Sequence, residues 1–348
     1  MRRLDADDPC PVRDGFAMPA EWYRHARTWM CWPCRLSAWD SPEAMLRAKQ
    51  AVARVARAIS TFEPVIMAAR PADAAEARLA TSGKVEIFEV ALDDSWARDS
   101  GPTFVVSEHD VAAVSWEFNA WGNKYRPWTD DAEFAGRLAR GFDIKLYRAP
   151  LVCEGGAIHG DGEGTLLTTE QCLLNENRNP HLSVQQVEER LALFTGTRKI
   201  IWLGDGFSDA ETDGHVDNIA CFVAPGRVLA GVPQSRTHPD YEPVLEAIRR
   251  LKAARDAHGR PLDVIELPQP RRGGEFRDGS PLQKSYVNFY LTNGGVVMPA
   301  FDDPADEPAR EILAACFPGR DILQIDALDI VAGGGGIHCI TQQEPEAP

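Results

Sequence analysis

The chain has 348 residues, of which 44% are hydrophobic and 26% are charged, and its formal net charge is −15. This composition is typical of a globular protein long enough for one large core or two modest ones. An acidic surface repels phosphate backbones and anionic lipids, so nucleic acid and membrane surfaces are poor partners and small cations are better ones. No apolar run reaches the ~18 residues of a membrane span, and the acidic first residues lack the apolar segment of a signal peptide.

The eight cysteines are scattered and lie mostly in apolar runs. Such usage is typical of a reducing compartment rather than of a disulfide framework, so we expect a cytoplasmic protein. Cys31 and Cys34 form a C-x-x-C motif that could be a redox pair. No second C-x-x-C completes a zinc site, and no clear strand-then-helix pattern surrounds the pair. Residues 1–40 are therefore expected to pack on the core as an aromatic-rich segment.

Strands and helices alternate along the first half of the chain, which favours an α/β fold. Ser41 and Pro42 mark the start of a helix over 41–59, whose apolar residues recur at steps of three and four. A turn is expected at 121–125. Further helices are expected at 72–80 and 130–140, and strands at 64–69, 85–90, 103–106, 111–118 and 144–147.

The second half continues the alternation. Ser183 and Gln186 form a capping box that predicts a helix. Segments 286–291 and 296–300 predict a hairpin, and 268–281 is a loop with three arginines and three glycines. No linker divides the chain, so a single domain over 1–348 is expected. The other expected elements are strands at 200–203, 264–267 and 322–325 and helices at 239–257 and 309–317.

Charged and aromatic residues gather directly after the strand at 85–90. Asp93, Asp94 and Asp99 lie within seven residues together with Trp96 and Arg98. Loops at strand ends often carry function, carboxylates pair well with a guanidinium, and an aromatic face attracts a delocalised cation. A solvated acidic turn in which Arg98 is paired internally is an equally good interpretation.

A run of four glycines, 333–336, precedes Ile337, His338 and Cys339. Glycine allows close approach of other groups at an entropic cost, so the run predicts a tight loop that presents the Cys339 thiol to a small planar substrate. A flexible loop with a buried, inert cysteine is the alternative. The pattern G-G-x-I-H occurs at 155–159 and again at 334–338, with Glu154 before the first copy, which suggests repeated supersecondary units.

His215 and Asp217 lie two residues apart, before the apolar run 219–223. If they begin a strand, their side chains lie on one face. A histidine beside a carboxylate is a tuned acid or base, although a purely structural His–Asp pair is the alternative interpretation.

Five of these residues are candidates for one reactive site. They come from segments spread over the whole chain, so they can meet only in one compact domain. No metal-binding spacing such as H-E-x-x-H is present, which argues against metal-dependent hydrolysis. Acids suit a cationic reacting centre better than the oxyanion of an ordinary cysteine hydrolase. Two carboxylates could hold the nitrogens of a guanidinium and align its carbon with a thiolate. The candidates are Asp99, Glu154, His215, Asp217 and Cys339.

Acidic neighbours raise the pKa of a thiol, and the thiolate is the nucleophile. We therefore expect the positive charge of the substrate, together with His215, to help form the thiolate of Cys339.

These motifs resemble those of the agmatine deiminases, which belong to the guanidino-group-modifying superfamily and are related to bacterial peptidylarginine deiminase. Several long motifs match in the right order, nearly from end to end of the chain. The resemblance is carried by residues 18–22, 28–33, 93–102, 161–170, 177–180, 212–218, 285–290 and 333–343.

The resemblance implies a five-bladed α/β propeller with pseudo-fivefold symmetry. It implies hydrolysis of agmatine to N-carbamoylputrescine and ammonia, with no metal or organic cofactor. Cys339 would form a covalent amidino-thioether, and His215 would be the general acid and base. Asp99 and Asp217 would hold the guanidinium, and Glu154 would support one of its nitrogens or the histidine. A homodimer or larger homo-oligomer is expected, and the substrate-binding candidates are Trp96, Asp94, Glu211 and Asn288.

Three segments depart from the family pattern. Residues 231–240 lack the expected tryptophan and acidic run, and Ala210 stands where an aspartate is usual. The loop 268–281 is shorter than in close family members and carries Arg271, Arg272 and Arg277. Arginines at the mouth could hold a carboxylate, so a guanidino acid or a peptide with a C-terminal arginine is an alternative substrate. Amidino transfer to an amine, and a non-catalytic protein that binds guanidines or polyamines, are further alternatives.

Overall fold

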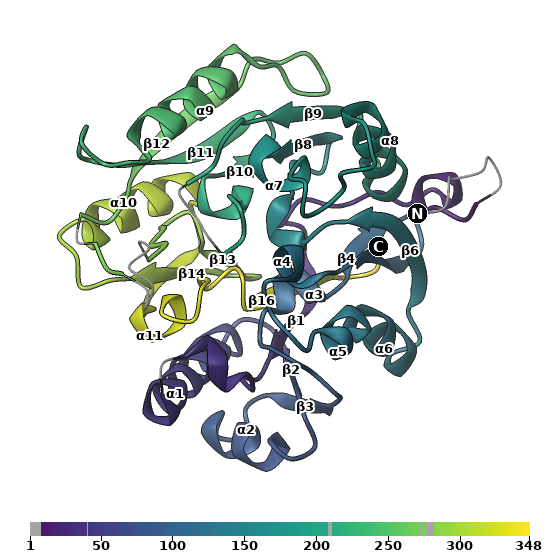
Figure 1. Ribbon diagram of the computed structural model, residues 1–348, viewed down its shortest axis with the longest axis vertical. Coiled ribbons are helices and arrows are strands. Elements are labelled where there is room, and N and C mark those ends of the chain that lie inside the picture. The colour runs from purple at the N-terminus through teal and green to yellow at the C-terminus, as the bar shows by residue number, and fades with distance from the viewer. Residues whose placement is uncertain (1–7, 40, 208–210, 272, 276–281) are drawn as a thin grey trace.

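Five separate mixed sheets hold the strands of the computed structural model, which describes residues 8–39, 41–207, 211–271, 273–275 and 282–348 (Figure 1). The first sheet has the order β16–β1–β2–β3, with β1 (His25–Cys31), β2 (Val65–Ala69), β3 (Glu86–Glu89) and β16 (Thr341–Pro345). The others are β4 (Thr103–Val106), β5 (Val111–Glu117) and β6 (Lys145–Val152); β7 (His159–Gly160), β8 (Thr165–Thr168) and β9 (Lys199–Trp202); β10 (Ala220–Ala224), β11 (Arg227–Val232) and β12 (Asp263–Pro268); and β13 (Tyr290–Leu291), β14 (Gly295–Ala300) and β15 (Asp321–Asp326).

The sheets share one connection pattern. The leading strand of each sheet (β16, β4, β7, β10 or β13) pairs antiparallel with the second strand, and the second pairs parallel with the third. Parallel neighbours need a crossover, which a helix usually supplies. Here the crossover helices are α1 (Pro42–Ile59), α6 (Phe134–Gly141), α8 (Val184–Thr195), α9 (Tyr241–Ala253) and α10 (Asp306–Cys316).

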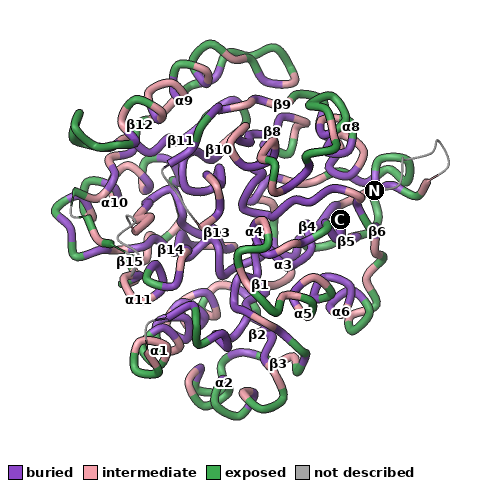
Figure 2. The backbone as a smooth tube through the Cα atoms, viewed as in Figure 1, coloured by how far each residue is buried: buried purple, intermediate pink, exposed green. Residues whose placement is uncertain are grey.

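The helices lie on the outside of the molecule, whereas β10, β13 and β16 lie nearer its middle (Figure 1). The backbone is correspondingly buried towards the middle and exposed on the outer turns (Figure 2). Short elements connect these layers: η1 (Pro11–Asp14), η2 (Leu36–Ala38), η3 (Gly155–Ala157), η4 (Val216–Asn218), α2 (Ala74–Ala80), α3 (Ala97–Ser100), α4 (Ala120–Asn123), α5 (Thr129–Ala132), α7 (Glu170–Leu173) and α11 (Leu328–Val331).

The α/β alternation is confirmed, but several expected elements differ. The helix expected at 130–140 is divided into α5 and α6 at Glu133. The turn expected at 121–125 includes α4, in which Trp121 and Gly122 have φ of 53° and 90°. The strand expected at 286–291 is wrong over most of its length, because residues 285–288 form a turn and β13 begins only at Tyr290.

The segment 1–40 contains the unexpected strand β1. Its last four residues are buried, so no apolar–polar alternation marks it. Trp29 and Trp32 pack in the core as expected, and Cys31 and Cys34 are buried free thiols. Burial raises the pKa of both thiols above their ordinary value, which disfavours the redox interpretation. In the described part of the chain, no helix combines the length and the apolar character needed to cross a membrane.

The capping box at the start of α8 gives a test of local stability. The Ser183 hydroxyl accepts from the Gln186 amide, and the Gln186 side chain accepts from the Ser183 amide at 2.9 Å. We predict that Ser183→Ala lowers the free energy of unfolding by about 1 kcal/mol, because a helix N–H loses its partner. Ser183→Asp, which can still accept this bond, should change it far less. Equal effects of both changes in chemical denaturation would contradict the prediction.

Candidate active site

The sequence-predicted catalytic residues share one position in their sheets. Each lies in the turn that precedes the leading strand, so the common connection pattern brings five distant segments together. These residues are Asp99 before β4, Glu154 before β7, His215 and Asp217 before β10, and Cys339 before β16; Asn288 holds the same place before β13.

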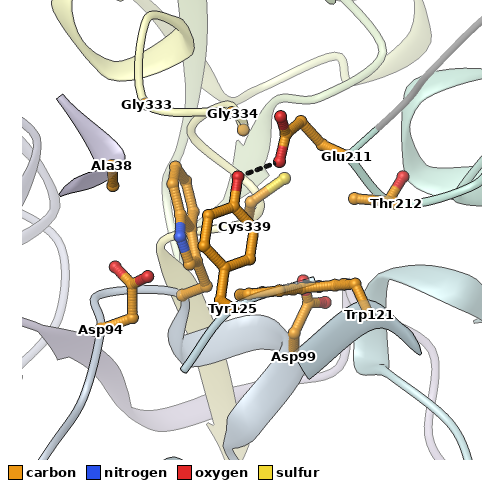
Figure 3. Close-up of a pocket in the computed structure, with 12 residues that line it drawn as sticks. Ala38, Asp94, Asp99, Trp121, Tyr125, Glu211, Thr212, Gly333, Gly334 and Cys339 are labelled. Carbon is orange, nitrogen blue, oxygen red and sulfur yellow. Dashed lines mark hydrogen bonds between the residues drawn. The ribbon is translucent and has the colours of Figure 1, made fainter. Parts of the chain in front are cut away.

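A cavity with about 330 Å³ of empty space opens onto Cys339 and Asp99. Figure 3 shows Trp121, Tyr125 and Glu211 around the thiol. The cavity is lined by Ala38, Asp94, Trp96, Asp99, Trp121, Tyr125, Glu211, Thr212, Gly333, Gly334, Gly335 and Cys339.

The glycine run forms the expected tight loop against this cavity. A Cβ on Gly335 would lie 2.6 Å from the Trp96 ring, and a Cβ on Gly336 would lie 2.2 Å from Asn288 Oδ1. Real Cβ atoms do not approach other atoms so closely, so only glycine fits at these two positions. The loop thereby places the thiol of Cys339 between these neighbours.

Cys339 Sγ lies 3.6 Å from Asp217 Oδ2 and accepts a hydrogen bond of 3.3 Å from Asn288 Nδ2. Burial raises the pKa of this thiol well above its ordinary value, and the nearby Asp217 and Asp99 carboxylates raise it further. The free protein therefore holds a neutral thiol, and a positive charge bound beside it would favour the thiolate.

His215 caps the start of η4, so the condition that it begins a strand with Asp217 is not met. The strand β10 begins only at Ala220, yet both side chains still point into the same cluster. His215 Nδ1 lies 3.8 Å from Asp99 Oδ1, and Nε2 lies 3.6 Å from Glu154 Oε2. Neither ring nitrogen has a hydrogen-bond partner among the described residues.

Carboxylates surround this buried imidazole. Burial opposes the charged form of His215, but Asp99, Cys172 and Glu154 outweigh it and hold the pKa of His215 well above its ordinary value. Glycine again permits the approach, since a Cβ on Gly156 would lie 2.6 Å from His215 Nδ1. The imidazole can therefore carry a proton at neutral pH.

Two carboxylates of the cluster are oriented by residues to which the sequence assigned no role. Trp121 Nε1 donates to Asp99 Oδ2 at 2.9 Å, and the Gly156 amide donates to Asp99 Oδ1 at 3.0 Å. Arg178 Nε donates to Glu154 Oε1 at 2.8 Å. No local pattern marks Arg178, although it lies within a matched motif, because its partner is set only by the fold.

A second buried network supports the Asp217 carboxylate. His338 Nδ1 lies 2.9 Å from Asp217 Oδ2, and its Nε2 lies 2.8 Å from Glu21 Oε1. Arg98 pairs with Glu21 at 3.3 Å, outside its own loop, and Asp94 and Asp99 are buried, so the alternative of a solvated acidic turn is wrong. His159 Nε2 lies 3.6 Å from Glu21 Oε2. The histidines of the two G-G-x-I-H copies thus face the same carboxylate, which the repeated pattern could have suggested.

The substrate-binding candidates lie in two different places. Asp94, Trp96 and Glu211 line the cavity, whereas Asn288 lies beneath it against Cys339. Asp94 is bonded at 2.7 Å to Arg35, and burial raises its pKa to about 6.

The aromatic groups of the cavity are held in place. Trp96 stacks on Trp39 with ring centroids 6.4 Å apart. Glu211 accepts from the Tyr125 hydroxyl, as Figure 3 shows. The sequence placed Tyr125 in a turn and gave it no role in the site.

The departures from the family pattern lie partly outside the described residues, namely at Ala210, Arg272 and Arg277. Arg271 is described, and its Nε donates to Gln234 at 2.7 Å. It does not line the cavity that opens onto Cys339. One group in the described chain has donor atoms close enough to hold a metal ion: Glu154, Cys172 and His215, whose ligand atoms lie within 4.8 Å of one another.

The protein is therefore an α/β protein in which five sheets share one strand order. Buried carboxylates lie around a cysteine and a histidine at its site. Residues 17–345 match the Porphyromonas-type peptidyl-arginine deiminase family. The chain belongs to this family.

Individual relatives and solved structures support the same family membership. The chain is 45% identical over 359 residues to an agmatine deiminase of Pseudomonas aeruginosa, covering 96% of this chain and 97% of that one. It is similar to the structure of an Enterococcus faecalis agmatine deiminase, with a TM-score of 0.94, 36% identity and full coverage of both chains. It is also similar to a substrate-bound C. jejuni agmatine deiminase with one cysteine replaced by serine, with a TM-score of 0.86, 27% identity and 95% and 97% coverage. The family resemblance seen in the sequence is confirmed.

The Glu21 network yields a prediction about stability and pH. Burial alone would raise the pKa of Glu21, but His338, Arg98 and His159 hold it well below its ordinary value. A depressed carboxyl pKa stabilises the fold above the unfolded-state pKa and ceases to do so as pH falls. We predict that Glu21→Gln lowers the free energy of unfolding by about 3 kcal/mol at neutral pH, because Arg98 is left buried without its counter-charge.

The deficit of Glu21→Gln relative to wild type should narrow as pH falls below about 4, because the unfolded wild-type chain then takes up a proton at Glu21 while the folded protein does so only at lower pH. The control is Glu307→Gln, which removes a carboxylate from an exposed pair with Arg310. Surface pairs contribute little, so its effect should be much smaller. A pH-independent deficit for Glu21→Gln in thermal or denaturant melts would contradict the assignment.

Proposed function

We propose that the protein is an agmatine deiminase, which hydrolyses agmatine to N-carbamoylputrescine and ammonia through a covalent intermediate on Cys339. The observation that carries the proposal is the buried cluster of Asp99, Glu154 and Asp217 around His215 and Cys339. Buried carboxylates are costly unless a cation matches them. A planar guanidinium offers both the charge and the paired N–H donors that carboxylates accept. Similarity to agmatine deiminases supports this substrate.

The first half of the reaction forms the intermediate. Asp99 and Asp217 hold the guanidinium nitrogens, so that the central carbon lies against Cys339 Sγ. The bound cation lowers the thiol pKa, so the S–H bond of Cys339 breaks and its proton passes to solvent. The thiolate then attacks the carbon, and a C–S bond forms. His215 then gives a proton to the departing nitrogen, the C–N bond breaks, and ammonia leaves an amidino-thioether.

The second half releases the product. Neutral His215 takes a proton from water, the resulting hydroxide attacks the same carbon, and the C–S bond breaks. N-carbamoylputrescine leaves and the thiol is restored. Glu154, oriented by Arg178, supports the charged form of His215 during both proton transfers.

The finer architecture is part of the same proposal. The five sheets would be the blades of a pseudo-fivefold α/β propeller, a view supported by their shared strand order and by the common position of the site residues. The proposed partner is a small cationic guanidine, and a homodimer or larger assembly and a cytoplasmic location stay predictions.

The nucleophile is tested by substitution. Cys339→Ser should lower ammonia release from agmatine more than about 10³-fold, because serine lacks an easily ionised thiol. The matched control replaces Cys31 and Cys34 by alanine, which should leave turnover near the wild-type value. Loss of turnover in this control would favour the C-x-x-C motif as the reactive pair.

A substrate panel tests the specificity. Agmatine, free arginine and a peptide ending in arginine should be compared for ammonia release, and agmatine is expected to be turned over best. Turnover only of a carboxylate-bearing guanidine would keep the mechanism but overturn agmatine as substrate. Absence of ammonia release from every guanidine, with folded protein, would favour a binding protein.

The thiol pKa gives a prediction about pH. Alkylation of Cys339 by neutral iodoacetamide should rise with pH and not level off by pH 9, since burial and Asp217 raise the pKa of this thiol. Asp217→Asn removes a negative charge 3.6 Å from Sγ and should speed alkylation at pH 8 while abolishing turnover. Asp321→Asn, at an exposed position in β15, is the control. Slower alkylation of Asp217→Asn, measured by peptide mass spectrometry, would contradict this account.

A further inference from the structure

We infer that Glu154, Cys172 and His215 form a site for a soft divalent cation such as Zn²⁺, and that this cation inhibits the enzyme by occupying His215. Their donor atoms lie within 4.8 Å of one another, and all three residues are buried. Binding of the ion does not depend on the proposed function; only the inhibition rests on it.

Two of the three donor separations are close to those of a tetrahedral zinc site. Cys172 Sγ lies 3.9 Å from Glu154 Oε2, and His215 Nε2 lies 3.6 Å from the same oxygen. Zinc bonds of about 2.3 Å to sulfur and about 2.0–2.2 Å to nitrogen and oxygen place such donors roughly 3.4–3.6 Å apart. Movements of a few tenths of an ångström would bring these two pairs to zinc-binding distances, and the third pair, Cys172 Sγ and the ligand nitrogen of His215, lies within 4.8 Å.

The ligand types and their charges also suit a soft cation. Thiolate, imidazole and carboxylate are the zinc ligands found in proteins, and three of them leave a fourth position for water. His215 Nε2 has no hydrogen-bond partner in the described chain, so its lone pair is available once the ring is neutral. The carboxylates of Asp99 and Asp217 lie nearby and add favourable negative charge.

The surrounding contacts orient the three ligands. Arg178 Nε holds Glu154 Oε1 at 2.8 Å and leaves Oε2 directed to the site. His215 Nδ1 lies 3.8 Å from Asp99 Oδ1, on the opposite edge of the ring from Glu154. A metal-binding histidine usually has a carboxylate or carbonyl at its other nitrogen, and such outer contacts raise metal affinity. The Thr169 hydroxyl accepts from the Cys172 amide and fixes the start of α7.

Binding exchanges protons for the ion. The S–H bond of Cys172 breaks, an S–Zn bond forms, and the thiol proton passes to solvent. His215 also gives up its Nε2 proton when the ring is charged. Zinc affinity should therefore increase with pH. With its Nε2 lone pair held by the metal, His215 can neither protonate the leaving ammonia nor activate water.

The test measures Zn²⁺ binding directly, at buffered free metal concentrations, by the metal retained after desalting. Wild type is expected to bind one equivalent and to lose ammonia release in parallel. Cys172→Ala should weaken binding at least about 100-fold, since loss of an outer contact alone costs 10–100-fold. Cys172→Ser keeps the shape of the side chain and serves if the alanine variant does not fold.

Two controls separate this site from other thiols. Cys339→Ser should retain the bound ion, and Cys153→Ala, whose buried thiol donates to the Glu154 carbonyl at 3.4 Å, should do so too. Co²⁺ should give a thiolate charge-transfer band with Cys339→Ser but not with Cys172→Ala. Absence of binding to wild type, full binding to both Cys172 variants, or loss of binding in Cys339→Ser would each overturn the inference. The measurements of metal binding do not require that agmatine be the substrate; only the loss of ammonia release does.

Discussion

The concentration of negative charge in a buried place is the constraint on which the rest of the site depends. Asp99, Glu154 and Asp217 all lie within a few ångströms of His215 or Cys339, where water cannot screen them. The fold offsets each one only in part, with indole and amide N–H groups at Asp99, a guanidinium at Glu154 and an imidazole at Asp217. Asp217 Oδ1 has no hydrogen-bond partner among the described residues. What is left unmatched is the space beside the thiol. A cation bound beside these carboxylates would also favour the thiolate of Cys339.

The loops that lead into the strands show how the fold produces this concentration. A strand connection that is repeated in every sheet carries each preceding turn to the same region of the molecule. The identity of one residue in each turn then decides the chemistry: aspartate before β4, glutamate before β7, and cysteine before β16. The sheets are otherwise ordinary, and their crossover helices contribute burial and stability rather than reactive groups.

The sequence predicted the cluster of reactive residues better than their surroundings. Long motifs around Asp99, His215 and Cys339 are specific because each combines rare residues at fixed spacings. The contacts of Glu21, Arg178 and Cys172 join segments far apart in the chain, and no local pattern encodes such pairs. The α/β alternation followed from periodicity, but β1 was missed because it is largely buried.

The turn at η4 shows the limit of pattern reading within the site itself. His215 and Asp217 have the spacing of a strand face, yet Gly214, with φ of 80°, turns the chain before them. The side chains of His215 and Asp217 reach the same cluster because of that turn. The segment 285–288 was misread for a related reason, since its aromatic and apolar residues resemble a strand while Ser285 and Asn288 close a turn through their backbones.

The pairing of β16 with β1 has a consequence for how the protein is made. β1 (His25–Cys31) and its antiparallel partner β16 (Thr341–Pro345) lie far apart in the chain, so one edge of β1 has no neighbour until synthesis has reached β16. Cys339 immediately precedes the partner strand. The thiol and the missing edge strand therefore enter the molecule together, and a nascent chain that has built every other sheet still has neither a complete first sheet nor the Cys339 thiol.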